Sequence, residues 1–151
     1  MKVLVVYDSV YGNTEKIAGA IARALASSGE VKVLRASEVN QSDLESVDLL
    51  VVGSPTQGGR QTPAIKEFLS KIPANALKNV SVASFDTRLS TRLVGVFGYA
   101  AGRIAEILKD KGALLATPPE GFIVKGREGP LKDRELERAA VWAKGIMESK
   151  K

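Results

Sequence analysis

Hydrophobic positions follow two different periods along this chain. Short unbroken apolar runs, many of them β-branched, are bounded by polar residues or glycine, which is typical of strands buried in a parallel sheet. They predict strands at 3–6, 31–34, 47–53, 80–85 and 113–117. Between them, apolar residues recur every third or fourth position, which indicates helices with one buried face. They predict helices at 14–28, 62–72, 99–111 and 132–147.

Glycine and proline mark where these elements begin and end. Gly29 and Gly112 follow two of the helices, and Thr62-Pro63 reads as the cap and first residue of another. Pro118-Pro119 interrupts the fifth strand, which residues 121–125 then continue. The polar segment 37–44 predicts a connection with at most a short helical turn.

The alternation of strand and helix predicts an α/β fold with a doubly wound, parallel, five-stranded sheet. The length suits a single domain over residues 1–151. Three loops rich in small polar residues, at 7–14, 53–63 and 86–92, follow the first, third and fourth strands. Ligands of such sheets bind at the carboxyl ends of the strands, so these loops are the expected binding edge.

The first loop, Tyr7-Asp8-Ser9-Val10-Tyr11-Gly12-Asn13-Thr14, joins a strand to a helix and carries no lysine or arginine. A Walker loop requires a lysine here, and a dinucleotide fingerprint requires three spaced glycines, so both are excluded. Backbone N–H groups, a helix dipole and the hydroxyl and amide side chains suit one terminal phosphate. The alternative is an ordinary capped turn after a first strand.

The spacing of this loop resembles the flavodoxin phosphate loop. An apolar pair precedes Tyr7, and Ser9, Gly12, Thr14, Ala18 and Ile21 follow at the family's intervals. The resemblance covers nearly the whole chain and implies a strand order of 2-1-3-4-5 and FMN as the cofactor. It also implies that the first loop holds the phosphate and that the other two flank the isoalloxazine ring. The cofactor-binding residues implied in this way are Ser9, Val10, Tyr11, Gly12, Asn13, Thr14, Pro55, Thr56, Gln57, Gly58, Gly59, Arg60, Asp86, Thr87, Arg88 and Arg92.

Neither ring-flanking loop offers the Trp or Tyr that stacks on the ring in many flavodoxins. Leu89, Leu93 or the planes of arginine side chains are left for that role. We interpret Tyr99 as a packing residue at a helix start and Trp142 as core or groove filler. Each of the loop arginines is open to two interpretations, a solvated side chain or a contact with the flavin or with an acidic partner. They are Arg60, Arg88 and Arg92.

The composition restricts the chemistry. The chain has no histidine and no cysteine, which excludes Ser-His-Asp and Cys-His catalysis, disulfides and the common zinc sites. We therefore expect no catalytic residue, no metal site, and redox chemistry that comes from a cofactor. No apolar run approaches the ~20 residues of a membrane span, and no cleavage signal follows the start. We expect a cytoplasmic protein that binds no membrane.

The formal net charge of +5 lies in the second half of the chain. Residues 1–86 carry nine Lys or Arg and nine Asp or Glu, whereas residues 87–151 carry thirteen and eight. This distribution favours redox partners with an acidic patch. Nucleic acid is disfavoured, because aromatic residues are few and acidic residues lie among the basic ones.

Three functions remain open. The first is an FMN-binding electron-transfer protein, and the second is an FMN-dependent oxidoreductase of the quinone-reductase type. The third is a non-redox interaction module that keeps the fold. A response-regulator receiver shares the fold but needs a phosphoacceptor Asp after the third strand, where Gly53-Ser54 stands, and a Lys where Pro118 stands.

Overall fold

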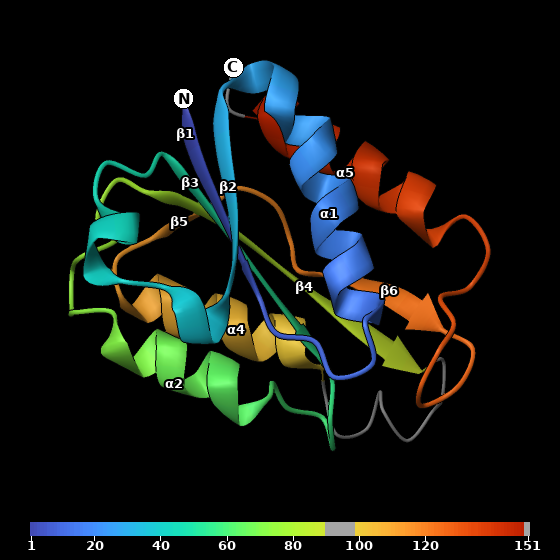
Figure 1. The fold of residues 1–151 in the computed structure, drawn as a ribbon. Helices are drawn as coiled ribbons and strands as arrows, with labels where there is room; N and C mark the ends of the chain where they lie inside the picture. Colours follow the sequence, from blue (N-terminus) through green and yellow to red (C-terminus); the bar gives the residue numbers. More distant parts are fainter. Residues whose placement is uncertain (90–98, 150–151) are drawn as a thin grey trace.

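A parallel sheet forms the centre of the molecule (Figure 1). The computed structural model describes residues 1–89 and 99–149. In the described residues the strand order is β2-β1-β3-β4-β5, with β6 also paired to β4, which confirms the predicted order. The strands are β1 (Lys2–Tyr7), β2 (Glu30–Arg35), β3 (Leu49–Pro55), β4 (Ser81–Leu89), β5 (Leu114–Leu115) and β6 (Glu120–Val124).

Helices cover both faces of this sheet (Figure 1). They are α1 (Asn13–Leu25), α2 (Pro63–Lys71), α4 (Ala100–Asp110) and α5 (Glu135–Ser149). The predicted first helix is shorter than expected, because its last turn, Ala26–Ser28, is a 3-10 helix. The segment between β2 and β3 contains two more 3-10 turns, Ala36–Glu38 and Gln41–Leu44, in agreement with the predicted lack of a full helix.

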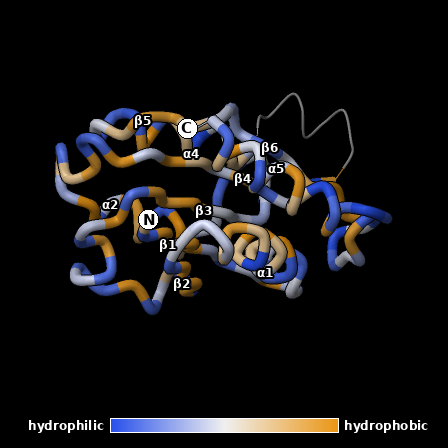
Figure 2. The backbone as a smooth tube through the Cα atoms, turned by 90° about the horizontal axis from the view of Figure 1, so that it is seen from above, coloured by the Kyte–Doolittle hydropathy of each residue, from blue (hydrophilic) through white to orange (hydrophobic). Residues whose placement is uncertain are grey.

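The core consists of two clusters, one on each face. Val3, Val5 and Val51 pack toward α1 and α5, whereas the alternate residues Leu4 and Val52 pack toward α2 and α4. Successive side chains of a strand point to opposite faces, so a strand covered on both sides is apolar throughout. Figure 2 shows the resulting hydrophobic segments along the strands and the facing helices.

The fifth strand position is divided into two short strands. β5 pairs with the beginning of β4, where Ser81 lies opposite Leu114, and β6 pairs with its end, where Leu89 lies opposite Val124. The two prolines at 118–119 lie in the gap between the two strands. This confirms the prediction that the strand is broken there and resumes.

The interpretation of residues 86–89 as part of a loop is wrong. β4 continues to Leu89 because β3 pairs with it as far as Thr87 on one side and β6 as far as Leu89 on the other. The ladder hydrogen bonds of two neighbours outweigh the polar character of this segment. The predicted site residue Arg92 and Leu93 lie outside the described residues.

Three aromatic rings fix the end of β4 against β6 and α5. Phe85, Phe122 and Trp142 contact one another edge to face, with ring centroids 6.0–6.1 Å apart. Trp142 is partly buried and packs against the core, which agrees with its interpretation as core or groove filler. Gly53 of β3 lies directly beside this group, since a Cβ atom at that position would be 2.0 Å from Cζ of Phe85. The ring thus occupies the place of a side chain on β3.

An ion-pair cluster fastens β6 to α5. Glu135 accepts the backbone N–H of Ile123 at 2.6 Å and a hydrogen bond from Nη2 of Arg138 at 2.7 Å. Arg138 also contacts Glu120 at 3.1 Å and lies over the ring of Phe122. Burial alone would raise the pKa of Glu135, but these hydrogen bonds hold it below its ordinary value of 4.5.

No helix among the described residues is long and apolar enough to cross a membrane.

Candidate functional site

The carboxyl ends of β1, β3, β4 and β6 surround a hollow of about 80 Å³. Most of the predicted site residues lie around it. Its lining consists of Ser9, Val10, Tyr11, Asn13, Thr14, Pro55, Thr56, Gln57, Thr87, Arg88, Leu89, Val124 and Arg127. The predicted residues Gly58, Gly59, Arg60 and Asp86 lie outside this lining, and Gly12 belongs to the loop without lining the hollow.

The β1–α1 loop is shaped by Gly12 and Ser9. Gly12 is the N-cap of α1 and has φ of 92°, a left-handed conformation that glycine adopts without a Cβ penalty. The hydroxyl oxygen of Ser9 accepts the N–H groups of Gly12 at 3.0 Å and Glu15 at 3.3 Å. The Ser9 hydroxyl proton is left to donate to a ligand.

The start of α1 presents free hydrogen-bond donors. The backbone N–H groups of Val10, Tyr11, Asn13 and Thr14 have no partner among the described residues. Such groups, together with the positive end of the helix dipole, form an anion site.

The helices that follow β3 and β4 begin differently. In α2 the Thr62 side chain accepts the N–H of Ile65. In α4 the N–H of Ala100 is accepted by Thr56, and that of Ala101 by Asp86 at 2.9 Å. These side chains occupy part of the donors at both helix starts, whereas several at the start of α1 are left for an anion.

Two buried threonines join the first loop to β4. The hydroxyl oxygens of Thr14 and Thr87 lie 2.8 Å apart, and the backbone carbonyl of Thr87 accepts the N–H of Thr56 at 2.9 Å. Only one of the two hydroxyl protons is used between the threonines. The other can donate into the hollow.

A third segment completes the site, and the sequence analysis missed it. The Asn13 side chain donates to the carbonyl of Glu128 at 3.1 Å. This hydrogen bond holds the turn after β6 against the β1–α1 loop and the start of α1, which we call the cradle. A Cβ atom on Gly129 would lie 2.6 Å from the Asn13 amide. This turn brings Arg127 to the hollow. The signal was present in the two glycines at 126 and 129 that follow a strand end.

Arg88 is paired and mostly buried, so its interpretation as a solvated side chain is wrong, whereas its contact with the flavin stays a prediction. Its guanidinium donates to both oxygens of Asp86, at 2.6 and 2.8 Å, and lies 3.4 Å from the ring centre of Tyr99. Asp86 and Arg88 stand two residues apart on one face of β4, which is possible because the segment is a strand. Burial raises the pKa of Asp86, which Arg88 opposes. Tyr99 is the N-cap of α4, as expected of a residue at a helix start.

Residues 57–60 form a tight turn beside the hollow. Gln57 and Arg60 exchange backbone hydrogen bonds of 2.8 and 3.0 Å, and Gly58 and Gly59 between them have φ of 56° and 78°. Two successive positive φ angles are those of a type I′ turn, which explains the glycine pair. Nε of Arg103 in α4 donates to the carbonyl of Gly59 at 2.8 Å and holds the turn in place.

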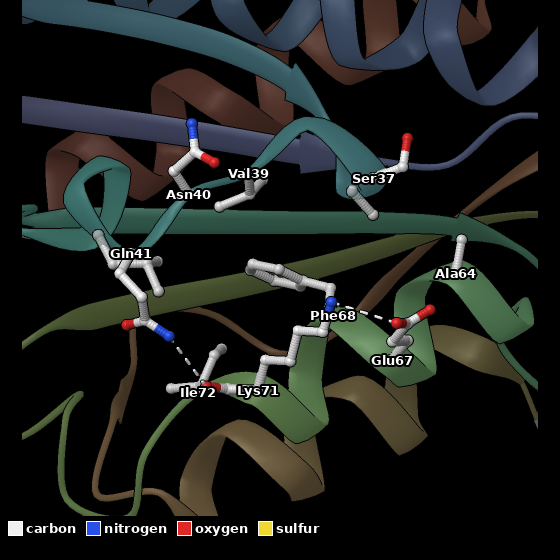
Figure 3. A pocket seen from close by; sticks show the side chains of 11 residues that line it. Ser37, Val39, Asn40, Gln41, Ala64, Glu67, Phe68, Lys71 and Ile72 are labelled. Atoms are coloured by element: carbon white, nitrogen blue, oxygen red, sulfur yellow. Dashed lines mark hydrogen bonds and ion pairs between the residues drawn. The ribbon is translucent and has the colours of Figure 1, made fainter.

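A larger hollow of about 360 Å³ lies away from the strand ends, between residues 36–44 and α2 (Figure 3). Its charged residues Lys71 and Glu67 pair with each other at 3.1 Å, and Gln41 donates to the backbone of Lys71. No glycine is among the described residues that line it. We therefore place the functional site at the smaller hollow.

The fold is that of an open-sheet α/β protein, and the free donors of the first loop lie where the strand order reverses. The chain belongs to the flavodoxin family, since the family model described as Flavodoxin matches residues 5–142. FMN is the cofactor of this family.

Curated relatives agree with this family. The chain is 37% identical over 73 residues to a flavodoxin of Aquifex aeolicus, which covers 47% of this chain and 40% of the relative. It is 29% identical over 119 residues to a putative diflavin flavoprotein of Synechocystis, which covers 74% of this chain and 18% of the relative. The matched part spans 16% to 40% of the length of the curated relatives.

A solved flavodoxin from the domain Archaea has the same fold. It superposes with a TM-score of 0.81 at 22% identity, over 100% of both chains.

Proposed function

We propose that this protein binds FMN through the cradle at the start of α1 and carries electrons between redox partners. The main observation behind this proposal lies just after the end of β1. There, four backbone N–H groups have no partner among the described residues, those of Val10, Tyr11, Asn13 and Thr14. A cradle with these donors at the topological switch point suits the terminal phosphate of FMN.

The residues present fit this group. A phosphate needs donors that approach closely without side-chain obstruction, and a Cβ atom on Gly12 would meet nothing within 4 Å, so the loop is open there. The hydroxyls of Ser9 and Thr14 are each positioned by another hydrogen bond and keep their orientation before the ligand arrives. Arg127 supplies the positive charge that the first loop lacks.

The ring would be flanked by residues 55–60 on one side and the end of β4 on the other. The apolar and aromatic side chains that line the hollow are those of Val10, Tyr11, Pro55, Leu89 and Val124. Tyr99 is engaged with Arg88 and is not available for stacking. FMN supplies the redox chemistry when bound, and the protein supplies the binding, the orientation and the local charge.

An oxidoreductase of the quinone-reductase type is the second candidate. Such an enzyme needs a group that holds or moves a proton beside the substrate. None of the described residues that line the hollow carries a carboxylate, and Asp86, next to Thr87, is buried and bonded to Arg88 and to the N–H of Ala101. This engagement favours the electron carrier. Most of this chain also matches a small part of a longer putative diflavin flavoprotein, which supports a role in electron transfer.

A titration of the FMN-free protein with FMN and with riboflavin tests the proposal. We expect flavin fluorescence to be quenched on binding and FMN to bind at least tenfold more tightly, since riboflavin lacks the phosphate. Equal affinities would refute the cradle. Consumption of NAD(P)H with a quinone as the only other addition would favour the enzyme over the carrier.

A further inference from the structure

Three cationic side chains line a third hollow, of about 330 Å³, beside the 57–60 turn. Arg60 comes from that turn, Lys66 from α2 and Arg103 from α4, and all three side chains are exposed. Gln61, Glu106 and Ile107 complete the lining. We call Arg60, Lys66 and Arg103 the cationic surface.

The cationic surface carries excess positive charge. Against three cations the lining has one carboxylate, that of Glu106, which leaves an excess of two. Within the described part of the chain, neither Arg60 nor Lys66 takes part in an ion pair. Like charges gathered at a concave surface attract anionic groups and speed their association.

This surface is connected to the cofactor region. Arg103 holds the carbonyl of Gly59 at 2.8 Å, and Gln57 at the other end of the same turn lines the phosphate hollow. The turn thus has the proposed cofactor on one side and the cationic surface on the other. A redox group docked there approaches the ring along the turn.

We propose that the cationic surface docks the acidic face of a one-electron redox protein. In the exchange the partner gives up one electron and the bound FMN gains one. The inference rests on the proposed function and adds the place and the chemistry of the partner. Exposed charges around an open hollow act on association rate and salt dependence, as expected of a transient electron-transfer contact.

The geometry favours a protein over a small anion. A phosphate site needs converging donors withdrawn from water, whereas these three side chains are exposed and come from separate elements. At the start of α2 beside them, Thr62 already accepts the N–H of Ile65. An extended acidic surface can reach all three charges at once.

The test uses the double variant Arg60→Gln/Lys66→Gln, which leaves Arg103 to hold the turn. The matched control is Lys71→Gln, a lysine at the other end of α2 that is paired with Glu67. The probe is an acidic [2Fe–2S] ferredoxin, titrated into the FMN-loaded and the FMN-free protein and followed by NMR at low and at physiological salt. Electron transfer from the reduced ferredoxin is timed by stopped flow.

We expect the double variant to weaken ferredoxin binding at least fivefold at low salt and to slow electron transfer in parallel, with both effects shrinking as salt rises. The control should match the wild type in ferredoxin binding and in FMN affinity, and the electron-transfer rates of all three proteins are compared at saturating FMN. Absence of ferredoxin binding by the wild type, or equal binding by the double variant, would overturn the proposal. The proposal would also be overturned if the double variant lost binding of inorganic phosphate but kept that of ferredoxin.

A failure of the proposed function gives a different result. In that case no protein in the set binds FMN, while the NMR titration of the FMN-free protein still decides whether the cationic surface docks an acidic partner.

Discussion

Replacing Thr14 by Val separates the phosphate cradle from the rest of the site. Val has nearly the shape of Thr and lacks only the hydroxyl, which lies 2.8 Å from that of Thr87 in a buried position. If this hydroxyl pair donates to the phosphate, its disruption removes one charge-assisted hydrogen bond, which contributes about 1.5–3 kcal/mol. FMN affinity should then fall roughly 10- to 150-fold.

The same change has a calculable effect on stability. The Thr87 hydroxyl loses its partner inside the protein, so the free energy of unfolding should fall by about 1–3 kcal/mol. Adding Thr87→Val removes the orphaned group as well. The double variant should therefore be more stable than the sum of the two single changes implies.

Fluorescence titration with FMN and riboflavin, beside urea unfolding of the FMN-free proteins, measures both effects. Ser84→Ala is the matched control, because Ser84 also has a buried hydroxyl, donated to the carbonyl of Ala101, and does not line the hollow. We expect this control to lose stability without losing the preference for FMN. The reasoning is refuted if Thr14→Val weakens riboflavin as much as FMN, or leaves FMN affinity unchanged.

Three further predictions follow from the packing and the charges. Gly53→Ala should lower the free energy of unfolding by about 1–3 kcal/mol, because the added Cβ atom meets the Phe85 ring. In a protein that already carries Phe85→Leu, the same change should lower it less. Chemical denaturation measures both losses, and additive losses would contradict the contact. Arg127→Gln should weaken FMN binding several-fold and make the flavin potential more negative, whereas Arg88→Gln should shift the potential less, since Asp86 already balances Arg88; potentiometry of both variants decides. The lowered pKa of Glu135 means that its contribution to stability is present above pH 4.5 and is lost as the pH falls through its folded-state pKa. Glu135→Gln should therefore be less stable than the wild type at pH 7 and should lose less stability on acidification. Thermal unfolding from pH 7 to pH 3 measures both effects.

The sequence predicted the strands and helices along the chain because unbroken apolar runs and glycine stops are local signals, whereas the order of the strands in the sheet followed from the resemblance to flavodoxins. It also predicted the first loop, where every position of the strand–turn–helix pattern agrees. It failed at Asp86 and Arg88, whose polar character suggested a loop. Their conformation is decided by pairing with β6, 35 residues later in the chain, and by an ion pair across one face of β4.

Arg127 was missed for a related reason. Nothing near it in the sequence relates it to the first loop, and the link is a hydrogen bond from Asn13 to the backbone of Glu128. Contacts of this kind depend on tertiary structure rather than on the identity of the residues involved. Single-sequence patterns therefore identify the cradle more readily than the segment that closes it.

The division of the fifth strand has a dynamic consequence. β5 has only two residues, both exposed, and one neighbour in the sheet, so its amide hydrogens should exchange with solvent through frequent local opening. β6 is longer and is fastened to α5 by Glu135 and Arg138, so its amides should exchange far more slowly. Because the gap at 118–119 separates β5 from β6, we expect local opening of this sheet edge to affect β5, the end remote from the cradle. The strand end that carries Arg127 to the hollow thus stays in register while the other end opens.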